Sequence, residues 1–344
     1  MKKKSIIKNS IIIFLVTGLI LYLVFGKDYH EIISLLSSVK LEYIFIALLV
    51  YFVYFLLDQL AFYLIIRNYN KKATYRFTLY IGIISKFFNG ITPLATGGQP
   101  MQVYELHKKN MSVVNSTNAV VLNLIAFKCA YIFLIVVLFI IDRCLNIFTN
   151  IPVLKVLTII GFIVNISFLL LLFVLSFSKN TNKKIVNFVI KIITKIFRKI
   201  NVEKVSKKIN DFCDEYYQSA KSIVKNKALF IKCISIQVIS LLFYFSIPYA
   251  LAFSLDINNL SLLSTIIAGE YIYIMGNSIP LPGSSGGMEY GFYGFFCKLI
   301  SGSGLSALMM LWRVLTYYIP MTIGAIIFGA YNINPSKKQE LSKK

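Results

Sequence analysis

FFNGITPLATGGQPMQVYEL (Phe87–Leu106) and GNSIPLPGSSGGMEYGFYGF (Gly276–Phe295) interrupt two of the apolar segments of this chain. Each stretch contains proline and a pair of adjacent glycines where a membrane-embedded helix would otherwise continue. Irregular backbone is tolerated at membrane depth only where it is buried in protein or lines a polar cavity. We therefore expect each stretch to open a pocket inside the bilayer instead of crossing it.

The composition places the rest of the chain in a membrane. Apolar residues make up 57% of the 344 residues and the mean hydropathy is +0.72, more than a soluble domain of this length uses. Apolar segments near the ~20 residues that a helix needs to cross the hydrocarbon predict an all-α polytopic membrane protein. The six predicted full transmembrane helices are Ser5–Phe25, Leu41–Ile66, Ser112–Ile141, Val153–Phe177, Leu229–Phe253 and Gly304–Ala330.

The N-terminal sequence MKKKSIIKNS with the apolar run that follows it is similar to a signal peptide. No small-x-small cleavage site follows this run, and many further apolar segments do. We therefore interpret it as a retained first helix.

Basic residues predict which loops face the cytoplasm. The initial MKKK, the cluster at residues 67–76, the sequence HKK at 107–109 and the final KKQELSKK all indicate that side, so both termini are expected there. Residues 77–110 then enter and return on the cytoplasmic side, and residues 261–303 on the outer side. Two re-entrant hairpins that enter from opposite sides predict an inverted repeat with a pocket near the midplane.

The chain divides into two predicted membrane halves, residues 1–177 and 229–331, and a basic cytoplasmic tail, residues 332–344. The connecting residues 178–228 carry thirteen Lys and Arg against four acidic residues and are predicted to be a cytoplasmic loop. Within the loop, IVNFVIKIITKIFRKI places basic side chains on one helical face and Ile and Phe on the other. This pattern is typical of an amphipathic helix on an anionic membrane surface, and a solvated basic linker helix fits it equally well.

Several classes of function have no support in the sequence. The five cysteines form no CxxC pair and there are two histidines, so neither a metal site nor a disulfide framework is indicated, and we expect no cofactor. The net charge of +22 comes mostly from loops between apolar segments, where basic residues set topology and attract anionic lipid head groups. Membrane phospholipids, anionic or aminoacylated, are therefore the expected partners, and nucleic acid is not.

Six ionisable side chains fall within the predicted membrane depth, and their charges balance. An isolated charge there is unfavourable, so these groups are expected to line a wet cavity or to form structural ion pairs, and both readings remain open. By position, three of the six are expected near an inner pocket: Asp58, Lys86 and Lys128. The other three, Glu270, Glu289 and Arg313, are expected near an outer pocket.

Each break is predicted to point the N-terminus of a new helix inward. Free backbone N–H groups and the positive end of the helix dipole favour an anion, here the phosphate of a lipid head group. Close helix packing through small residues is the alternative reading of the glycines. The residues predicted to contact the head group are Pro93, Gly97, Gly98, Gln99, Gln102, Tyr104 and Glu105 in the first hairpin, and Pro280, Pro282, Gly283, Gly286, Gly287 and Glu289 in the second.

The two stretches resemble those of the bacterial lysylphosphatidylglycerol synthase transmembrane-region family, also called flippase-like domain proteins. NGITPLATGGQPMQVYEL at Asn89–Leu106 is similar to the family pattern ITP-x-x-x-GGQP-x-Q-x-Y, and IPLPGSSGGMEYGF at Ile279–Phe292 to P-x-PG-x-x-GG-x-E-x-GF. The second departs slightly, with Leu281 where a small polar residue is common and Ser284 and Ser285 where Gly-Ser is usual. The order of the apolar segments resembles the family over nearly the whole chain.

The resemblance implies an integral protein of the bacterial plasma membrane that translocates a phospholipid or glycolipid such as lysylphosphatidylglycerol. The membrane half of the multiple peptide resistance factor is thought to do this, which would bring resistance to cationic peptides. An alternative is phosphatidylglycerol lysyltransferase activity, with lysyl-tRNA as the nucleic-acid partner. The family's cytosolic transferase domain has no counterpart in this sequence, so we do not expect the chain to be an enzyme on its own. A third possibility is a non-catalytic lipid-binding partner of a separate synthase.

Overall fold

The computed structural model describes residues 38–93, 95–148, 152–178, 214–215, 217, 226–276, 283–284, 286–300 and 302–333. All structural statements below concern these residues. The predicted first helix Ser5–Phe25 and the predicted amphipathic helix of the basic loop lie outside them. So do most of the predicted tail and two candidate site residues, Pro280 and Pro282.

The described part of the chain is all-α, as predicted, and five of its helical segments are long and apolar enough to cross a membrane. They confirm five of the six predicted spans, each within a few residues of its predicted ends. The long helices are α3 (Leu41–Tyr69), α6 (Val113–Leu145), α7 (Pro152–Phe177), α10 (Lys227–Ser254) and the continuous segment α13 (Ser303–Arg313), η1 (Val314–Tyr318) and α14 (Ile319–Ile333).

Four shorter helices form two hairpins. The first consists of α4 (Tyr75–Gly90) and α5 (Gly98–Lys108), and the second of α11 (Leu262–Gly276) and α12 (Gly287–Phe296). None of the four reaches the ~20 residues of a full span. Thr74 caps α4 by accepting a hydrogen bond from the N–H of Phe77. Because the four helices are too short for a full span, one end of each lies inside the bundle, where the proline and glycine positions predicted a break.

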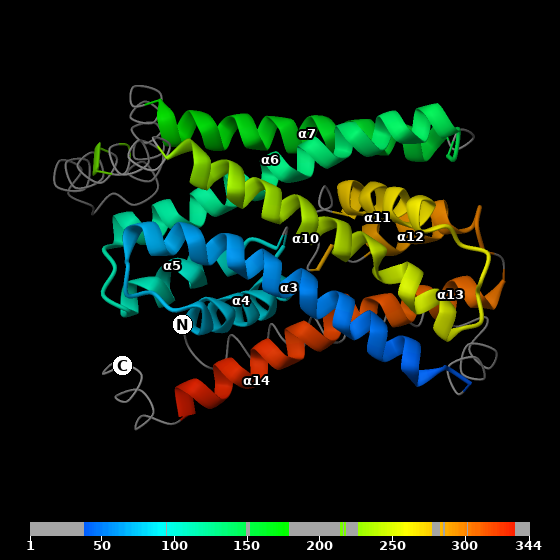
Figure 1. The fold of residues 1–344 in the computed structure, drawn as a ribbon, viewed down its shortest axis with the longest axis horizontal. Helices are drawn as coiled ribbons and strands as arrows, with labels where there is room; N and C mark the ends of the chain where they lie inside the picture. The colour runs from blue at the N-terminus through cyan, green and yellow to red at the C-terminus, as the bar shows by residue number, and fades with distance from the viewer. Residues whose placement is uncertain are drawn as a thin grey trace, which may run out of the picture.

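The order of elements repeats along the chain: a long helix, a hairpin and a second long helix occur twice. In Figure 1 the first hairpin lies toward one end of the bundle and the second toward the other. The first helices of the two repeats, α3 and α10, run antiparallel. The N–H of Lys40 bonds the carbonyl of Ser254 (3.0 Å) near one end of this pair, and Cys233 Sγ contacts the carbonyl of Ala61 (3.6 Å) toward the other. The first helices of the two repeats therefore have opposite directions in the bundle.

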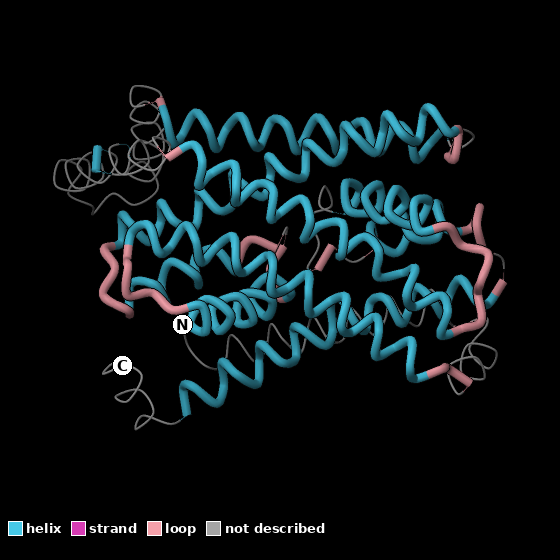
Figure 2. Tube along the Cα trace, viewed as in Figure 1, coloured by secondary structure: helices cyan, strands magenta, loops and turns pink. Residues whose placement is uncertain are grey.

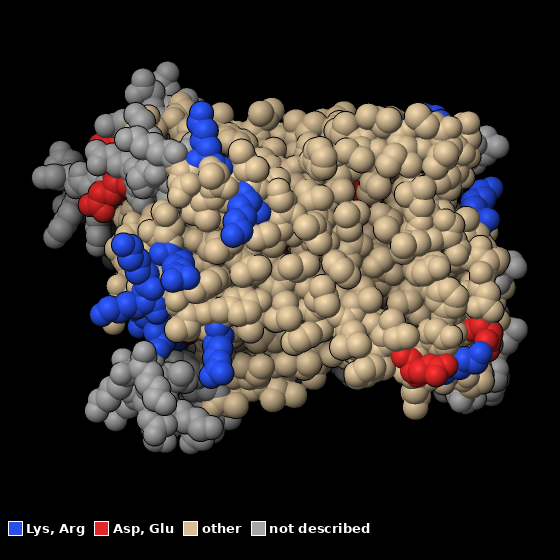
Figure 3. Space-filling view, in the orientation of Figure 1, with Lys and Arg blue, Asp and Glu red and all other residues tan. Residues whose placement is uncertain are grey.

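The surface matches a protein surrounded by lipid. Figure 3 shows a broad middle zone with few charges and a gathering of Lys and Arg at one end. Exposed basic residues at this end include Arg67, Lys71, Lys72 and Arg76, between α3 and the start of α4. Most loops lie at the two ends of the bundle, but Figure 2 also shows short loop segments in its interior, at the hairpin tips. These inner loops position the candidate site.

Candidate functional site

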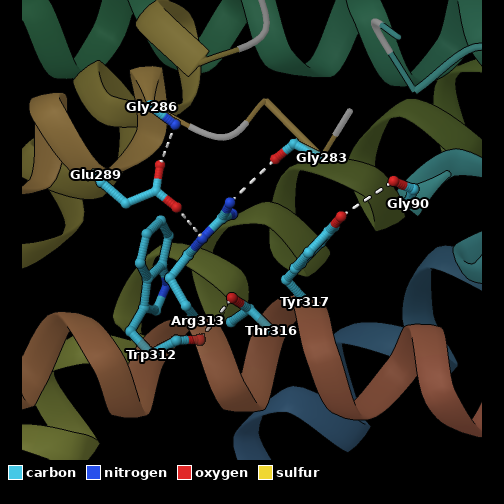
Figure 4. A network of polar contacts seen from close by, with 8 residues as sticks. All are labelled: Gly90, Gly283, Gly286, Glu289, Trp312, Arg313, Thr316 and Tyr317. Atoms are coloured by element: carbon cyan, nitrogen blue, oxygen red, sulfur yellow. Dashed lines mark hydrogen bonds and ion pairs between the residues drawn. The ribbon is translucent and has the colours of Figure 1, made fainter. Parts of the chain in front are cut away.

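The tips of both hairpins contact one turn of the last long helix (Figure 4). The carbonyl of Gly90, at the end of α4, accepts a hydrogen bond from the hydroxyl of Tyr317 (3.0 Å). The carbonyl of Gly283, from the second hairpin, accepts one from Nη2 of Arg313 (3.2 Å). Arg313 and Tyr317 are four residues apart and share a helix face. We call Gly90, Gly283, Gly286, Glu289, Arg313 and Tyr317 the hairpin junction.

The hairpin junction lies at mid-depth in the bundle. Arg313 and Tyr317 fall in the central part of the span Ser303–Ala330. Between them the backbone departs from α-helical geometry and forms a π-helical turn, Val314–Tyr318. Inside this turn the hydroxyl of Thr316 donates to the carbonyl of Trp312 (2.7 Å). Such turns are frequent at functional sites, because they rotate side chains away from the regular helical pattern.

Glycine is required at the junction for close approach. Gly283 has a φ of +61°, and a Cβ there would overlap the ring of Tyr317. A Cβ on Gly90 would lie 2.7 Å from the sulfur of Met321. Glycine at these two positions therefore allows a positive φ at Gly283 and close packing of α4 against the last helix at Gly90.

A buried ion pair links the second hairpin to the last helix. Oε1 of Glu289 lies 2.7 Å from Nε of Arg313, and both side chains are less than a tenth exposed. The other carboxylate oxygen of Glu289 accepts the N–H of Gly286 (2.6 Å) at the start of α12. The guanidinium also lies 4.7 Å from the centre of the Tyr317 ring. Gly287 follows in the first turn of α12 and is buried.

We predicted free backbone N–H groups at the starts of the new helices, and this prediction is wrong at three positions. In the first hairpin, the N–H of Gly97 donates to Thr92 Oγ1 (2.8 Å) and that of Gly98 to Asn89 Oδ1 (2.7 Å). Pro93 lies exposed at the tip of this hairpin. In the second hairpin, the N–H of Gly286 is taken by the carboxylate described above. The chain therefore satisfies these donors itself, because N–H groups buried in the bundle need acceptors.

The other candidate residues of the first hairpin spread along α5. Gln99, in its first turn, is half-buried, and its Oε1 has no hydrogen-bond partner among the described residues. Gln102 is also half-buried. Tyr104 is 52% exposed, and Glu105 is buried and paired with Lys108 (2.7 Å). Glu105 lies about 10 Å along the axis from the start of α5, so this carboxylate and Tyr104 are not at the tip.

The predicted inner charges Asp58 and Lys86 have neutral hydrogen-bond partners. Lys86 Nζ, on α4, donates to the hydroxyl of Tyr54 on α3 (3.0 Å). Asp58 accepts hydrogen bonds from the side-chain amides of Gln59 (2.7 Å) and Gln237 (3.1 Å). No carboxylate lies within ion-pair distance of Lys86 in the part of the chain that the structure describes.

The remaining two intramembrane charges lie away from the hairpin junction. Lys128 donates to Asn165 of α7 (2.6 Å). Glu270 is completely buried in α11, and neither of its carboxylate oxygens has a hydrogen-bond partner among the described residues. Of the six predicted charges, Glu289 and Arg313 alone form an ion pair within the described ranges.

Sequence reasoning missed several polar residues of this region. Asn89 and Thr92 lie inside the quoted first stretch, and their residue types favour helix capping, so this signal was available. Tyr317 sits in an apolar span with no neighbouring motif. The predicted span Ser112–Ile141 stops one residue before Asp142, whereas α6 continues to Leu145 and Asp142 is 5% exposed.

Two comparisons with known proteins bear on the chain. A family model described as "Lysylphosphatidylglycerol synthase TM region" matches residues 9–324. The match includes both hairpins and the last long helix through Gly324. A search of curated proteins found no match.

Proposed function

The chain belongs to the lysylphosphatidylglycerol synthase transmembrane-region family, and from this premise we propose that it is a lipid translocase. Its substrate would be a phospholipid or glycolipid with a phosphate-containing head group, such as lysylphosphatidylglycerol. One observation carries the proposal: two hairpins from opposite ends of the bundle end against the same turn of the last helix, at mid-depth.

A head group that crosses a bilayer must leave water, and polar groups without partners are strongly unfavourable in hydrocarbon. A translocase therefore needs polar protein groups at mid-depth that can be reached from both sides. The two hairpins bring backbone carbonyls and a carboxylate to this depth, where the last long helix supplies the guanidinium of Arg313. Each hairpin leads from the junction toward a different end of the bundle (Figure 1). Movement of one hairpin relative to the other would open the polar region to one leaflet at a time.

Lys86 is the best-placed group for the phosphate. Lys86 lies one turn before the end of α4, near the hairpin tip. Its Nζ donates a hydrogen bond to the neutral hydroxyl of Tyr54. Its Nζ lies 5.0 Å from the centre of the Tyr54 ring, and both Lys86 and Arg313 act electrostatically on Tyr244 of α10. An ammonium group at mid-depth is stabilised by an anion, and a lipid phosphate supplies one.

Reconstitution tests this proposal. Purified chain in phosphatidylglycerol vesicles is supplied with fluorescent phosphatidylglycerol or lysylphosphatidylglycerol in one leaflet, and a membrane-impermeant quencher reports exchange between leaflets. We expect faster exchange than in protein-free vesicles, slowed about ten- to a hundred-fold by Lys86→Gln, the range for losing one hydrogen bond to a charged group. Lys298→Gln, at an exposed lysine, is the control that keeps the native rate. Exchange no faster than in protein-free vesicles would rule out the translocase.

The description of the matching family includes the word synthase, which favours lysyl transfer to phosphatidylglycerol as a second candidate function. The same vesicles test it when lysyl-tRNA with labelled lysine is added. Labelled lipid formed by this chain alone would support the transferase. Binding of lipid without exchange or transfer would instead indicate a partner of a separate lipid synthase.

A further inference from the structure

Glu270 is a buried acid that the proposed function does not use. It is 0% exposed in α11, and both carboxylate oxygens lack a hydrogen bond among the described residues. A carboxylate in such surroundings is strongly unfavourable when it is ionised, and the group removes this penalty by binding a proton. Glu270 is therefore expected to be neutral in the conformation that the structure shows.

The neighbouring acid, Asp142 of α6, has the opposite environment. Its Oδ1 accepts the N–H of Phe148 (2.9 Å) and its Oδ2 accepts the hydroxyl of Tyr271 (2.9 Å). Asp142 also acts electrostatically on Glu270. The two acids therefore differ in their surroundings: Asp142 accepts hydrogen bonds from two donors, whereas Glu270 accepts none from the described residues.

The groups around Glu270 do not provide a countercharge. Tyr131 of α6 and Tyr271 of α11 are within its electrostatic range, and the buried hydroxyl of Tyr131 has no hydrogen-bond partner among the described residues. This hydroxyl can accept a hydrogen bond from a protonated carboxyl group.

The described basic residues of the helices packed on α11 do not pair with Glu270. On α6, Lys128 donates to Asn165 and Arg143 is exposed. On α10, Lys227 and Lys232 lie in the first two turns, about 20 Å or more along the axis from Phe245, which contacts Gly269 of α11. On α10, Tyr244 contacts the ring of Tyr273 on α11, with 5.8 Å between ring centres. On α12, Glu289 is already paired with Arg313. In α7, no titratable residue occurs between Val156 and Phe177. The described residues also contain no group of three acidic, histidine or cysteine side chains suited to a metal ion.

We propose that Glu270 is a proton-binding site whose protonation and release are coupled to movement of the second hairpin. Glu270 lies six residues before Gly276, the last residue of α11, about 9 Å along the helix axis. Movement of α11 would bring the carboxyl group into contact with water on one side. Its O–H bond then breaks, the proton goes to that water, and the carboxylate later takes up a proton from the other side. The coupling to lipid movement rests on the proposed function, whereas the protonation itself does not.

Two measurements test this inference separately. Infrared spectra of the purified full chain at neutral pH report the carbonyl band of protonated carboxyl groups. We expect a band that Glu270→Gln removes, that Glu270→Asp retains at a shifted position, and that Glu42→Gln, at an exposed acid of α3, leaves unchanged. A band that survives Glu270→Gln overturns the proton site.

The second measurement is lipid exchange in vesicles with a pH gradient. We expect the gradient to change the exchange rate of the native chain and of Glu270→Asp several-fold, and to have no effect on Glu270→Gln. If native exchange is fast but indifferent to the gradient, or responds to Na⁺ instead, the coupling is overturned while the translocase stands. If the native chain gives no exchange at all, the coupling fails together with the proposed function, and the infrared band still decides whether Glu270 binds a proton.

Discussion

The Glu289–Arg313 ion pair allows a quantitative test of the hairpin junction. The two side chains are 8% and 5% exposed, so water cannot replace a lost partner. Glu289→Gln leaves a buried guanidinium without its carboxylate, and Arg313→Gln leaves the carboxylate without its cation. Removing one partner of a buried pair costs about 3–5 kcal/mol of unfolding free energy. The double variant leaves no charge behind, so we expect it to be more stable than the sum of the single losses predicts, by about 1–3 kcal/mol.

The free energy of unfolding of the four proteins is measured by titrating mixed micelles with a denaturing detergent. The exposed pair Lys40–Asp256 provides a matched control, because its Lys→Gln and Asp→Asn variants should give no resolvable coupling. If the losses of Glu289→Gln and Arg313→Gln add to within about 0.5 kcal/mol, the two groups do not form a coupled pair and the junction as described is incorrect.

Three further predictions concern single positions. A Cβ at Gly324 would meet the backbone of α4, so Gly324→Ala should lower the unfolding free energy by about 1–3 kcal/mol. Gly329 has open space around it, so Gly329→Ala should leave the unfolding free energy unchanged. Equal effects of the two substitutions would argue against tight packing of α14 on α4. Gly283→Ala introduces strain at positive φ, about 1–2 kcal/mol, and its Cβ would also overlap the ring of Tyr317. Gly304→Ala, whose Cβ would make only ordinary van der Waals contacts, should be the less destabilising, and equal effects would contradict the tip contact. Tyr104→Ala should leave the rate of lipid exchange unchanged, because this side chain is exposed and away from the hairpin tip. A large decrease in the exchange rate would show that Tyr104 belongs to the site.

The long helices and the two breaks could be predicted from the sequence because both depend on local properties. A membrane helix must satisfy its own backbone, so an apolar run of sufficient length predicts it directly. The main errors concern the ends. Helix α3 was predicted to end at Ile66 and continues to Tyr69, since a helix does not stop where the hydrocarbon does. For the same reason the predicted span that ended at Ile141 missed Asp142, which is a buried residue of α6.

The hairpin junction could not be predicted, because its contacts join distant parts of the chain. The hydrogen bond between Gly90 and Tyr317 connects residues 227 positions apart. Its existence depends on how α4 packs against α14, which no local pattern encodes. The π-helical turn that holds Tyr317 likewise occurs in an apolar sequence with no proline or glycine inside it. Of the two readings left open for the six charges, ion pairing applies to Glu289 and Arg313 among the described residues, whereas Lys86 and Lys128 donate to neutral acceptors on neighbouring helices.

The contacts at the junction also separate the roles of its two cations in the proposed translocase. Arg313 already binds Glu289 and the carbonyl of Gly283, so a phosphate that took its donors would leave a buried carboxylate and a buried carbonyl without partners. Among its described contacts, Lys86 would give up its hydrogen bond to the Tyr54 hydroxyl, which can accept or donate elsewhere, and its position over the Tyr54 ring. The net free energy of phosphate binding therefore favours Lys86, with Arg313 fixing the position of the second hairpin. In the two proposals, the cation for the lipid phosphate lies on the first hairpin and the acid for the proton lies on the second, so relative movement of the two hairpins would couple them.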